Sequence, residues 1–191
     1  MEIQQNISLK PYNTFGIQAN AKRFVSVNFI KDLKEIIAAE KNIFLLGGGS
    51  NILLTGDVEK LVIHLNTKGI IVNDSGNNEV LATAEAGENW HEFVQWCVSQ
   101  NYGGLENLAL IPGNVGTAPI QNIGAYGVEI KDVFQQLEAI DIETGKTKIF
   151  TNEECNFGYR NSVFKNQLKG KYIIANVTFK LTKKNHVTNI S

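Results

Sequence analysis

The chain has 191 residues, of which 43% are hydrophobic and 19% charged, and its formal net charge is −1. This length fits one compact domain or two small ones and allows a sizeable apolar core. The near-neutral charge gives no electrostatic footprint for nucleic acid or an acidic membrane surface. No apolar run reaches the roughly 18 residues of a membrane span. Two cysteines exclude a disulfide framework and a four-cysteine zinc site.

The N-terminal segment has neither the basic region nor the apolar stretch of a secretory signal. Cys97 and Cys155 are far apart and form no CxxC pair, and Cys97 falls on an apolar helical stripe, which predicts a buried thiol. We therefore expect a cytoplasmic protein. The three histidines show no metal-ligand spacing, so no metal site is predicted.

Strands and helices alternate in the first third of the chain. A helix is predicted over residues 29–40, because apolar residues recur on one helical face at Ile30, Leu33, Ile36 and Ile37. Short apolar runs predict strands at residues 24–27, 43–46 and 61–65, and residues 52–54 are expected to be extended.

The rest of the chain is richer in hairpins. Residues 70–72 and 80–84 are predicted to pair, as are 137–142 and 146–150, and residues 172–181 form a last strand. Asn89 is a good N-cap for a helix whose core face we expect to be Trp90, Phe93, Val94, Cys97 and Val98. This mixed order favours an α+β fold over a doubly wound sheet. A boundary near residues 66–69 divides the chain into 1–67 and 68–191.

Two glycine-rich segments stand out among the 17 glycines. The first, Gly47-Gly48-Gly49-Ser50-Asn51, follows a predicted buried strand. Successive glycines allow a backbone whose N–H groups converge on an anion. No lysine follows as in a P-loop, and Ile52 stands where a dinucleotide fingerprint needs glycine. A phosphate cradle is favoured over a tight strand-to-strand connection.

The second segment runs from Gly103 to Gly127 with almost no charge. Loops of this length inside compact domains are usually functional or disordered, and the apolar content argues against disorder. Its buried backbone groups need partners. A flat, hydrogen-bonding cofactor would supply them, and so would a loop that bonds internally and packs on itself. The residues of this segment alone leave both interpretations open.

Arg160 lies among aromatic residues in Phe157-Gly-Tyr-Arg-Asn-Ser-Val-Phe164. An arginine here could hold a carboxylate through two hydrogen bonds. Taken alone, the segment favours a surface arginine that stacks on Tyr159 or Phe164.

Together these segments resemble the UDP-N-acetylenolpyruvoylglucosamine reductase (MurB) family, close to its type I branch. The resemblance spans nearly the whole chain and rests on ordered motifs. These are Asn13-Thr-Phe-Gly16, Leu46-Gly-Gly-Gly-Ser-Asn51, Ala86-Gly-Glu-Asn-Trp-His91, Gly104-Leu-Glu-Asn-Leu-Ala-Leu-Ile-Pro-Gly113, Pro119-Ile-Gln-Asn-Ile-Gly-Ala-Tyr-Gly127 and Gly158-Tyr-Arg-Asn-Ser-Val-Phe-Lys165.

The resemblance implies a two-subdomain, PCMH-like FAD-binding module followed by a substrate domain. It implies a catalytic role for Arg160 on the enolpyruvyl carboxylate, and a substrate border made by Tyr126 and Tyr159. The residues that it implies in FAD binding come from both loops and the last strand: Leu46, Gly47, Gly48, Gly49, Ser50, Asn51, Ile52, Pro112, Gly113, Gly116, Thr117, Gln121, Asn122, Gly124, Ala125 and Ile174.

The implied reaction reduces UDP-N-acetylglucosamine enolpyruvate with NADPH through FAD, in peptidoglycan precursor synthesis, in a protein expected to be a monomer. The family's proton-donating serine and partner glutamate belong to segments that have no match in these residues. We therefore expect the chain to lack the substrate domain and to bind FAD without turnover. The alternatives are a non-catalytic flavin-binding fragment and a structural α+β module.

Overall fold

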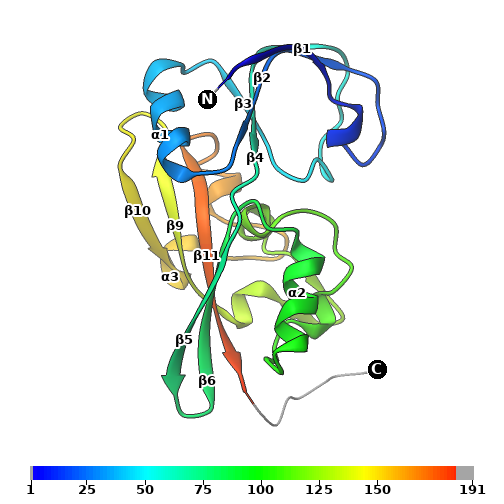
Figure 1. Cartoon of the computed structure of the whole chain (residues 1–191). Helices are drawn as coiled ribbons and strands as arrows, with labels where there is room; N and C mark the ends of the chain where they lie inside the picture. The colour runs from blue at the N-terminus through cyan, green and yellow to red at the C-terminus, as the bar shows by residue number, and fades with distance from the viewer. Residues whose placement is uncertain (1, 184–191) are drawn as a thin grey trace.

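Two β-sheets organise the chain in the computed structural model, which describes residues 2–183 (Figure 1). The first sheet has the strand order β1-β2-β4-β3. Strands β2, β4 and β3 run parallel, and β1 pairs antiparallel with β2. Their bounds are β1 Gln4–Ser8, β2 Asn20–Val27, β3 Ile43–Leu46 and β4 Val58–Leu65. The three predicted strands are confirmed, while β1 had no sequence signal and residues 52–54 lie outside any strand.

The predicted first helix is confirmed as α1, Ile30–Ala39. Its buried side chains are Leu33, Ile36 and Ile37, three of the four predicted. They share one core with apolar residues of β2 and β4 and also with Ile140, Ile173 and Ala175 of the second sheet. The helix therefore lies where both sheets contribute to a single apolar core. Figure 1 shows the helix next to both sheets.

The second sheet is antiparallel throughout, in the order β10-β9-β11-β6-β5. Both predicted hairpins are present as β5–β6 and β9–β10, and the last strand lies between them. The bounds are β5 Ile70–Gly76, β6 Glu79–Glu85, β9 Phe134–Asp141, β10 Thr147–Thr151 and β11 Tyr172–Thr182. The α+β prediction is thus confirmed.

Helix α2, Trp90–Ser99, covers one face of the second sheet. The Asn89 side chain accepts a hydrogen bond from the Glu92 N–H at 3.1 Å, as its predicted N-cap role requires. The Trp90 and Phe93 rings lie 5.7 and 5.4 Å from that of Phe179 on β11. Val98 is 52% exposed, so its prediction as a core residue is wrong: it lies at the edge of the buried stripe, one residue before the helix ends.

The short helix α3, Asn152–Cys155, follows Thr151, whose side chain accepts a hydrogen bond from the Glu154 N–H. Cys155 and Cys97 are both buried free thiols. Burial, with a smaller contribution from a nearby carboxylate in each case, raises the pKa of each thiol to about 12. Neither cysteine therefore carries a reactive thiolate near neutral pH.

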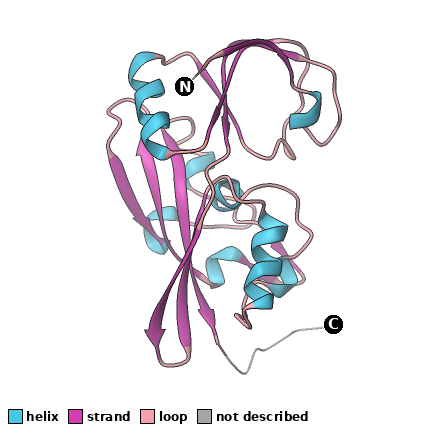
Figure 2. Ribbon diagram, viewed as in Figure 1, coloured by secondary structure: helices cyan, strands magenta, loops and turns pink. Residues whose placement is uncertain are grey.

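The long glycine-rich connection forms short elements of its own, visible in Figure 2 as helical turns between loops. Two single turns of 3-10 helix and one longer 3-10 helix lie in it and in the residues that follow. The paired elements are the two-residue strands β7 Gly124–Ala125 and β8 Val128–Glu129. The helical turns in this stretch are η2 Glu106–Leu108, η3 Val115–Gln121 and η4 Ile130–Asp132, and η1 Lys10–Tyr12 and η5 Val163–Lys165 lie elsewhere.

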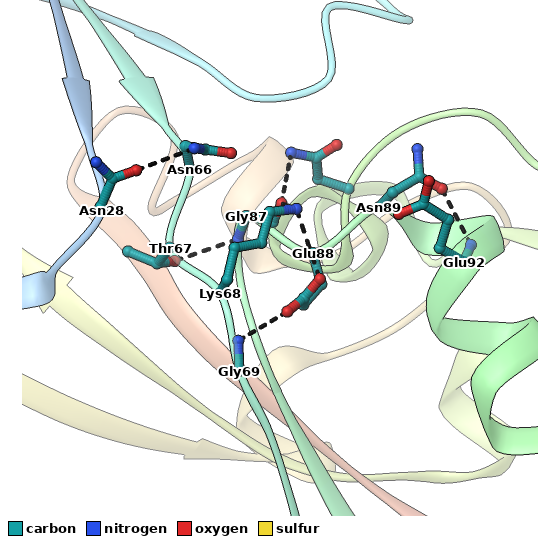
Figure 3. Close-up of polar contacts among 10 residues, drawn as sticks. Asn28, Asn66, Thr67, Lys68, Gly69, Gly87, Glu88, Asn89 and Glu92 are labelled. Carbon is teal, nitrogen blue, oxygen red and sulfur yellow. Dashed lines mark hydrogen bonds and ion pairs between the residues drawn. The ribbon is translucent and has the colours of Figure 1, made fainter. Parts of the chain in front are cut away.

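Residues 66–69 connect the two sheets and are held by polar contacts (Figure 3). The Asn66 amide donates to Asn28 at 2.9 Å, and the Lys68 ammonium donates to the Gly87 carbonyl at 2.6 Å. The Thr67 hydroxyl accepts a hydrogen bond from the Gly87 N–H at 3.3 Å. A Cβ on Gly87 would lie only 2.5 Å from the Thr67 nitrogen, so the close approach of the two segments requires glycine there.

Glu85 lies beside this connection. Its Oε2 atom is buried and has no hydrogen-bond partner within residues 2–183. Burial raises the pKa of the Glu85 carboxyl above its ordinary value; a hydrogen bond from Thr67 opposes this, and the charges of Glu138 and Glu88 add to it. The fold thus favours the protonated carboxyl more than the unfolded chain does.

Replacing this carboxyl should therefore stabilise the protein in a pH-dependent way. Ionisation of Glu85 costs stability as the pH rises toward and through the raised folded-state pKa. We expect Glu85→Gln to raise Tm by about 1–3 °C at pH 7.5 and by less at pH 4. Thermal unfolding at both pH values measures this, with the exposed Glu35→Gln as control. An equal gain at both pH values would contradict the assignment.

Candidate functional site

A cavity of about 480 Å³ lies where the two glycine-rich segments meet. Its wall is made by β3 and the loop that follows, by residues 112–123, and by residues 164–174 that lead into β11. The volume falls in the range of small-molecule sites in proteins. Segments far apart in the sequence thus build one binding-sized space between the sheets.

Most of the residues expected to bind the cofactor line this cavity. They are Leu46, Gly47, Gly48, Gly49, Ser50, Asn51, Ile52, Pro112, Gly116, Thr117, Gln121 and Ile174. Gly113 lies directly behind the wall, where its Cα would be 3.1 Å from a Cβ on Gly48. Three further cofactor candidates, Asn122, Gly124 and Ala125, and the substrate candidates Tyr126, Tyr159 and Arg160 lie beyond the lining.

The first glycine loop has unused hydrogen-bond donors on residues that line the cavity. Within the described part of the chain, no group accepts a hydrogen bond from the backbone N–H groups of residues 47–51. All five of these residues line the cavity. Backbone N–H groups that are left unpaired cost free energy unless water or a ligand accepts from them, and successive ones form a concave anion site. A ligand diphosphate fits this arrangement.

Gly49 shows why this loop needs glycine. Its φ is +61°, and a Cβ there would lie 2.0 Å from the carbonyl oxygen of Tyr12, behind the loop. A side chain at Gly49 would therefore collide with the chain behind the loop, whether or not a ligand is bound. Gly48 is limited from another side, since its Cβ would lie 2.6 Å from the Asn114 side-chain oxygen.

The second glycine-rich segment satisfies its own backbone. The N–H groups of Val115 and Gly116 donate to the carbonyls of Glu88 and Ala86 at 2.9 and 3.0 Å. A Cβ on Gly116 would lie 2.4 Å from the Ala86 Cβ, so this glycine permits close packing. The segment thus bonds to residues 86–88 of the chain and also lines the cavity, and contact with a cofactor stays a prediction.

Side chains join the two glycine segments along the wall. The Ser50 hydroxyl donates to the Pro112 carbonyl at 3.2 Å, and the Asn51 amide donates to the Gln121 side-chain oxygen at 3.3 Å. Asn114, which sequence reasoning missed, donates to the Gly87 carbonyl at 3.4 Å and faces Gly48. No local pattern singles out Asn114, because its role depends on tertiary contacts.

The charged side chains among the lining residues are both cationic, Lys165 and Lys169. No aspartate or glutamate is among the described residues that line the cavity. The positive potential of the two ammonium groups and of the glycine-loop N–H groups favours a ligand with negative charge.

Arg160 is held at the tip of a tight turn next to the cavity. The turn is closed by backbone hydrogen bonds between Gly158 and Asn161 at 3.0 and 3.1 Å, and the φ of Arg160 is +52°. Its guanidinium donates to the Gly124 carbonyl at 2.6 Å, and its own carbonyl accepts from Lys165 at 3.0 Å. Arg160 is exposed, but it is fixed by these contacts and does not simply stack on a neighbouring ring.

Asn122 is completely buried, and its side chain serves the same turn. Its amide donates to the Gly158 carbonyl at 3.0 Å, and its oxygen accepts from the Lys131 N–H at 3.2 Å. Both ends of the carboxamide thus have partners in the chain. Tyr126 and Tyr159, at 77% and 86% exposure, lie on the outer side of this region.

Within residues 2–183, no helix is both long and apolar enough to cross a membrane. The same residues contain no group of three or more histidine, cysteine, aspartate or glutamate side chains that could hold a metal ion.

The sequence family described as "FAD binding domain" matches residues 21–151, more than half of the chain, and the protein belongs to this family. The match includes the loop with the unpaired N–H groups and the internally bonded segment. Because the free donors and cationic rim suit a diphosphate, the residues present fit FAD.

Two relatives indicate more closely which kind of FAD-binding protein the chain resembles. The chain is 57% identical to UDP-N-acetylenolpyruvoylglucosamine reductase of Flavobacterium johnsoniae over 100% of the chain and 57% of that relative. It is 49% identical to the same-named protein of Pseudomonas savastanoi over 96% of the chain and 55% of the relative. The chain thus spans little more than half the length of these reductases and corresponds to their N-terminal part.

Solved structures agree with this fold. The reductase of the same type from Thermus caldophilus has a TM-score of 0.78 at 27% identity, covering 97% of this chain and 64% of that one. A cholesterol oxidase shares the fold alone, with a TM-score of 0.61 at 14% identity over 95% of this chain and 38% of its own.

Substitution at Gly49 should show whether the conformation of the loop at residues 47–51 is needed for FAD binding. Gly49→Ala forces an L side chain into a left-handed φ and against the Tyr12 carbonyl, which costs roughly 1–3 kcal/mol in strain. We expect the FAD dissociation constant to rise at least tenfold, measured by quenching of flavin fluorescence. The matched control is Gly56→Ala, where a Cβ meets nothing within 4 Å. Equal affinities in the two variants would argue against the cradle.

Proposed function

We propose that this chain is the FAD-binding part of a reductase that converts UDP-N-acetylglucosamine enolpyruvate to UDP-N-acetylmuramate with NADPH, in peptidoglycan precursor synthesis. The observation that carries the proposal is the row of unpaired N–H groups on a cavity wall, in a chain 57% identical to a reductase of that name. Bound FAD would supply the hydride transfer that links NADPH to the enolpyruvyl double bond.

In this proposal the loop of residues 47–51 binds the cofactor diphosphate through its backbone N–H groups. Lys165 and Lys169 add positive charge at the rim of the same cavity. Ile174 and Gln121 contribute an apolar and a polar wall for the rest of the cofactor. Gly113, Asn122, Gly124 and Ala125, next to this wall, remain proposed cofactor neighbours.

Arg160 is proposed to bind the enolpyruvyl carboxylate and to stabilise the negative charge that develops there. One of its nitrogens is held by the Gly124 carbonyl, which fixes the guanidinium and leaves its other N–H groups for a carboxylate. The exposed rings of Tyr126 and Tyr159 stand beside the same turn and are proposed to border the substrate.

The divisions 1–67 and 68–191 are proposed as the two parts of the FAD module, in a cytoplasmic, monomeric protein. The proton donor is proposed to lie in the part of the relatives that this chain does not match. The chain covers 57% of the length of the Flavobacterium johnsoniae reductase, and we expect from this that the chain alone binds FAD but does not reduce the substrate.

The test compares the isolated chain with the full-length reductase, using NADPH oxidation coupled to the enolpyruvyl substrate. We expect FAD binding by both and coupled turnover only at full length. Arg160→Ala in the full-length protein should lower substrate reduction about 10²–10³-fold, the usual cost of losing one charge-stabilising donor. Its FAD content and NADPH-dependent flavin reduction should not change. Substrate reduction at the wild-type rate by the Arg160→Ala protein would refute the role of Arg160. Turnover by the isolated chain would refute the proposal that the proton donor lies outside it.

A further inference from the structure

The segment Asn13-Thr14-Phe15-Gly16 has no role in the site described so far, although it contacts the first glycine loop. Asn13 is 7% exposed, and its side chain makes three hydrogen bonds to backbone. Its amide donates to the carbonyls of Leu9 and Ile17 at 2.7 and 3.1 Å, and its oxygen accepts from the Ile17 N–H at 2.9 Å. One side chain thus closes the loop formed by residues 9–17.

This loop is anchored to the first sheet. Leu9 is completely buried, and its N–H donates to the Ala19 carbonyl at 2.8 Å. The Tyr12 ring lies 4.9 Å from the rings of Phe24 on β2 and His64 on β4. Because both ends and the middle are fixed, the loop is a rigid support and not a free connection.

The support contacts the glycine loop at one carbonyl. The Thr14 N–H donates to the Gly49 carbonyl at 3.2 Å, and the Thr14 hydroxyl lies 3.5 Å from the same oxygen. The described chain has no cis peptide bonds, so the peptide that joins Gly49 to Ser50 is trans. In a trans peptide the C=O and the next N–H point in opposite directions. With the carbonyl held by Thr14, the Ser50 N–H points away from the support, and Ser50 is one of the residues that line the cavity.

We propose that Asn13 and Thr14 are positioning residues for the anion site: they fix the orientation of the Gly49–Ser50 peptide so that its N–H faces a ligand diphosphate. The proposal rests on the proposed binding of the FAD diphosphate at residues 47–51. Neither residue lines the cavity, so both act through Gly49. Without this contact the peptide is free to rotate and to present its carbonyl, which repels an anion.

The test is a set of variants that remove the contact in different ways. Thr14→Pro deletes the N–H donor, and the extended backbone of Asn13, with φ −140° and ψ 138°, accepts a following proline. Thr14→Val keeps the N–H and loses only the hydroxyl. Asn13→Ala opens the supporting loop. The matched control is Asn152→Ala, because Asn152 also clamps two backbone carbonyls, at 2.8 and 3.3 Å, but lies away from the cavity.

Dissociation constants for FAD and for ADP, which carries the diphosphate without the flavin, are measured below the unfolding temperature of each variant. We expect Thr14→Pro and Asn13→Ala to weaken both ligands at least tenfold and by similar factors. Thr14→Val should stay within threefold of the wild type, and Asn152→Ala within twofold. Should Thr14→Pro not fold, Asn13→Ala against Asn152→Ala makes the same comparison.

Each outcome has one meaning. Wild-type affinity in Thr14→Pro and Asn13→Ala would overturn the positioning role and leave the proposed FAD site intact. Equal losses in Asn13→Ala and Asn152→Ala would also overturn it, since general destabilisation would then explain both. A wild-type chain that binds neither FAD nor ADP would instead refute the proposed function itself.

Discussion

The site depends on the five backbone N–H groups of residues 47–51, for which residues 2–183 of the folded chain offer no partner. Residues 47–51 directly follow β3, which ends at the buried Leu46. The parallel pairing of β3 with β4 also ends at Leu46, so these residues do not continue the hydrogen bonding to β4. Unpaired donors at such a position are unfavourable unless an anion or water accepts from them. Much of the surrounding structure keeps these donors aligned: a glycine with positive φ, a support behind it and a wall of packed segments in front.

The glycines of the two glycine-rich segments have different structural roles. Glycines of the first line the cavity and have N–H groups without a partner in residues 2–183, whereas those of the second allow close packing, as Gly116 does against Ala86. The second segment is rigid because its N–H groups are already bonded to residues 86–88, which are in turn held by the connection between the sheets. Rigid walls on both sides reduce the ordering cost of binding a flexible dinucleotide.

Local patterns in the sequence predicted most of the regular structure. Helix α1 and both hairpins follow from periodicity and turn residues, which are properties of neighbouring positions. Strand β1 was missed because Gln4–Ser8 is polar and mostly exposed, so it has no apolar alternation to detect. Val98 was placed in the core because helical periodicity alone does not show where the neighbouring sheet stops.

The site was predictable to a lesser extent. The glycine loop was found because consecutive glycines are rare, and the resemblance to a family supplied some further lining residues, such as Pro112, Gln121 and Ile174. Asn114, Lys169 and Thr14 were not identified, because each acquires its role only when distant segments meet. Arg160 was identified in the sequence, but its surroundings there favoured a surface residue that stacks on an aromatic ring. Its hydrogen bond to the Gly124 carbonyl, which joins distant segments, shows that the side chain is fixed.

We propose that the backbone N–H groups of residues 47–51 bind the cofactor diphosphate. Amide proton and nitrogen chemical shifts of the uniformly labelled chain, recorded during titration with FAD, report on each of these groups. We expect downfield shifts of these amide protons, as new charge-assisted hydrogen bonds form, and small changes for Val115 and Gly116, whose N–H groups are already bonded. Unchanged shifts at residues 47–51 in a chain saturated with FAD would contradict it.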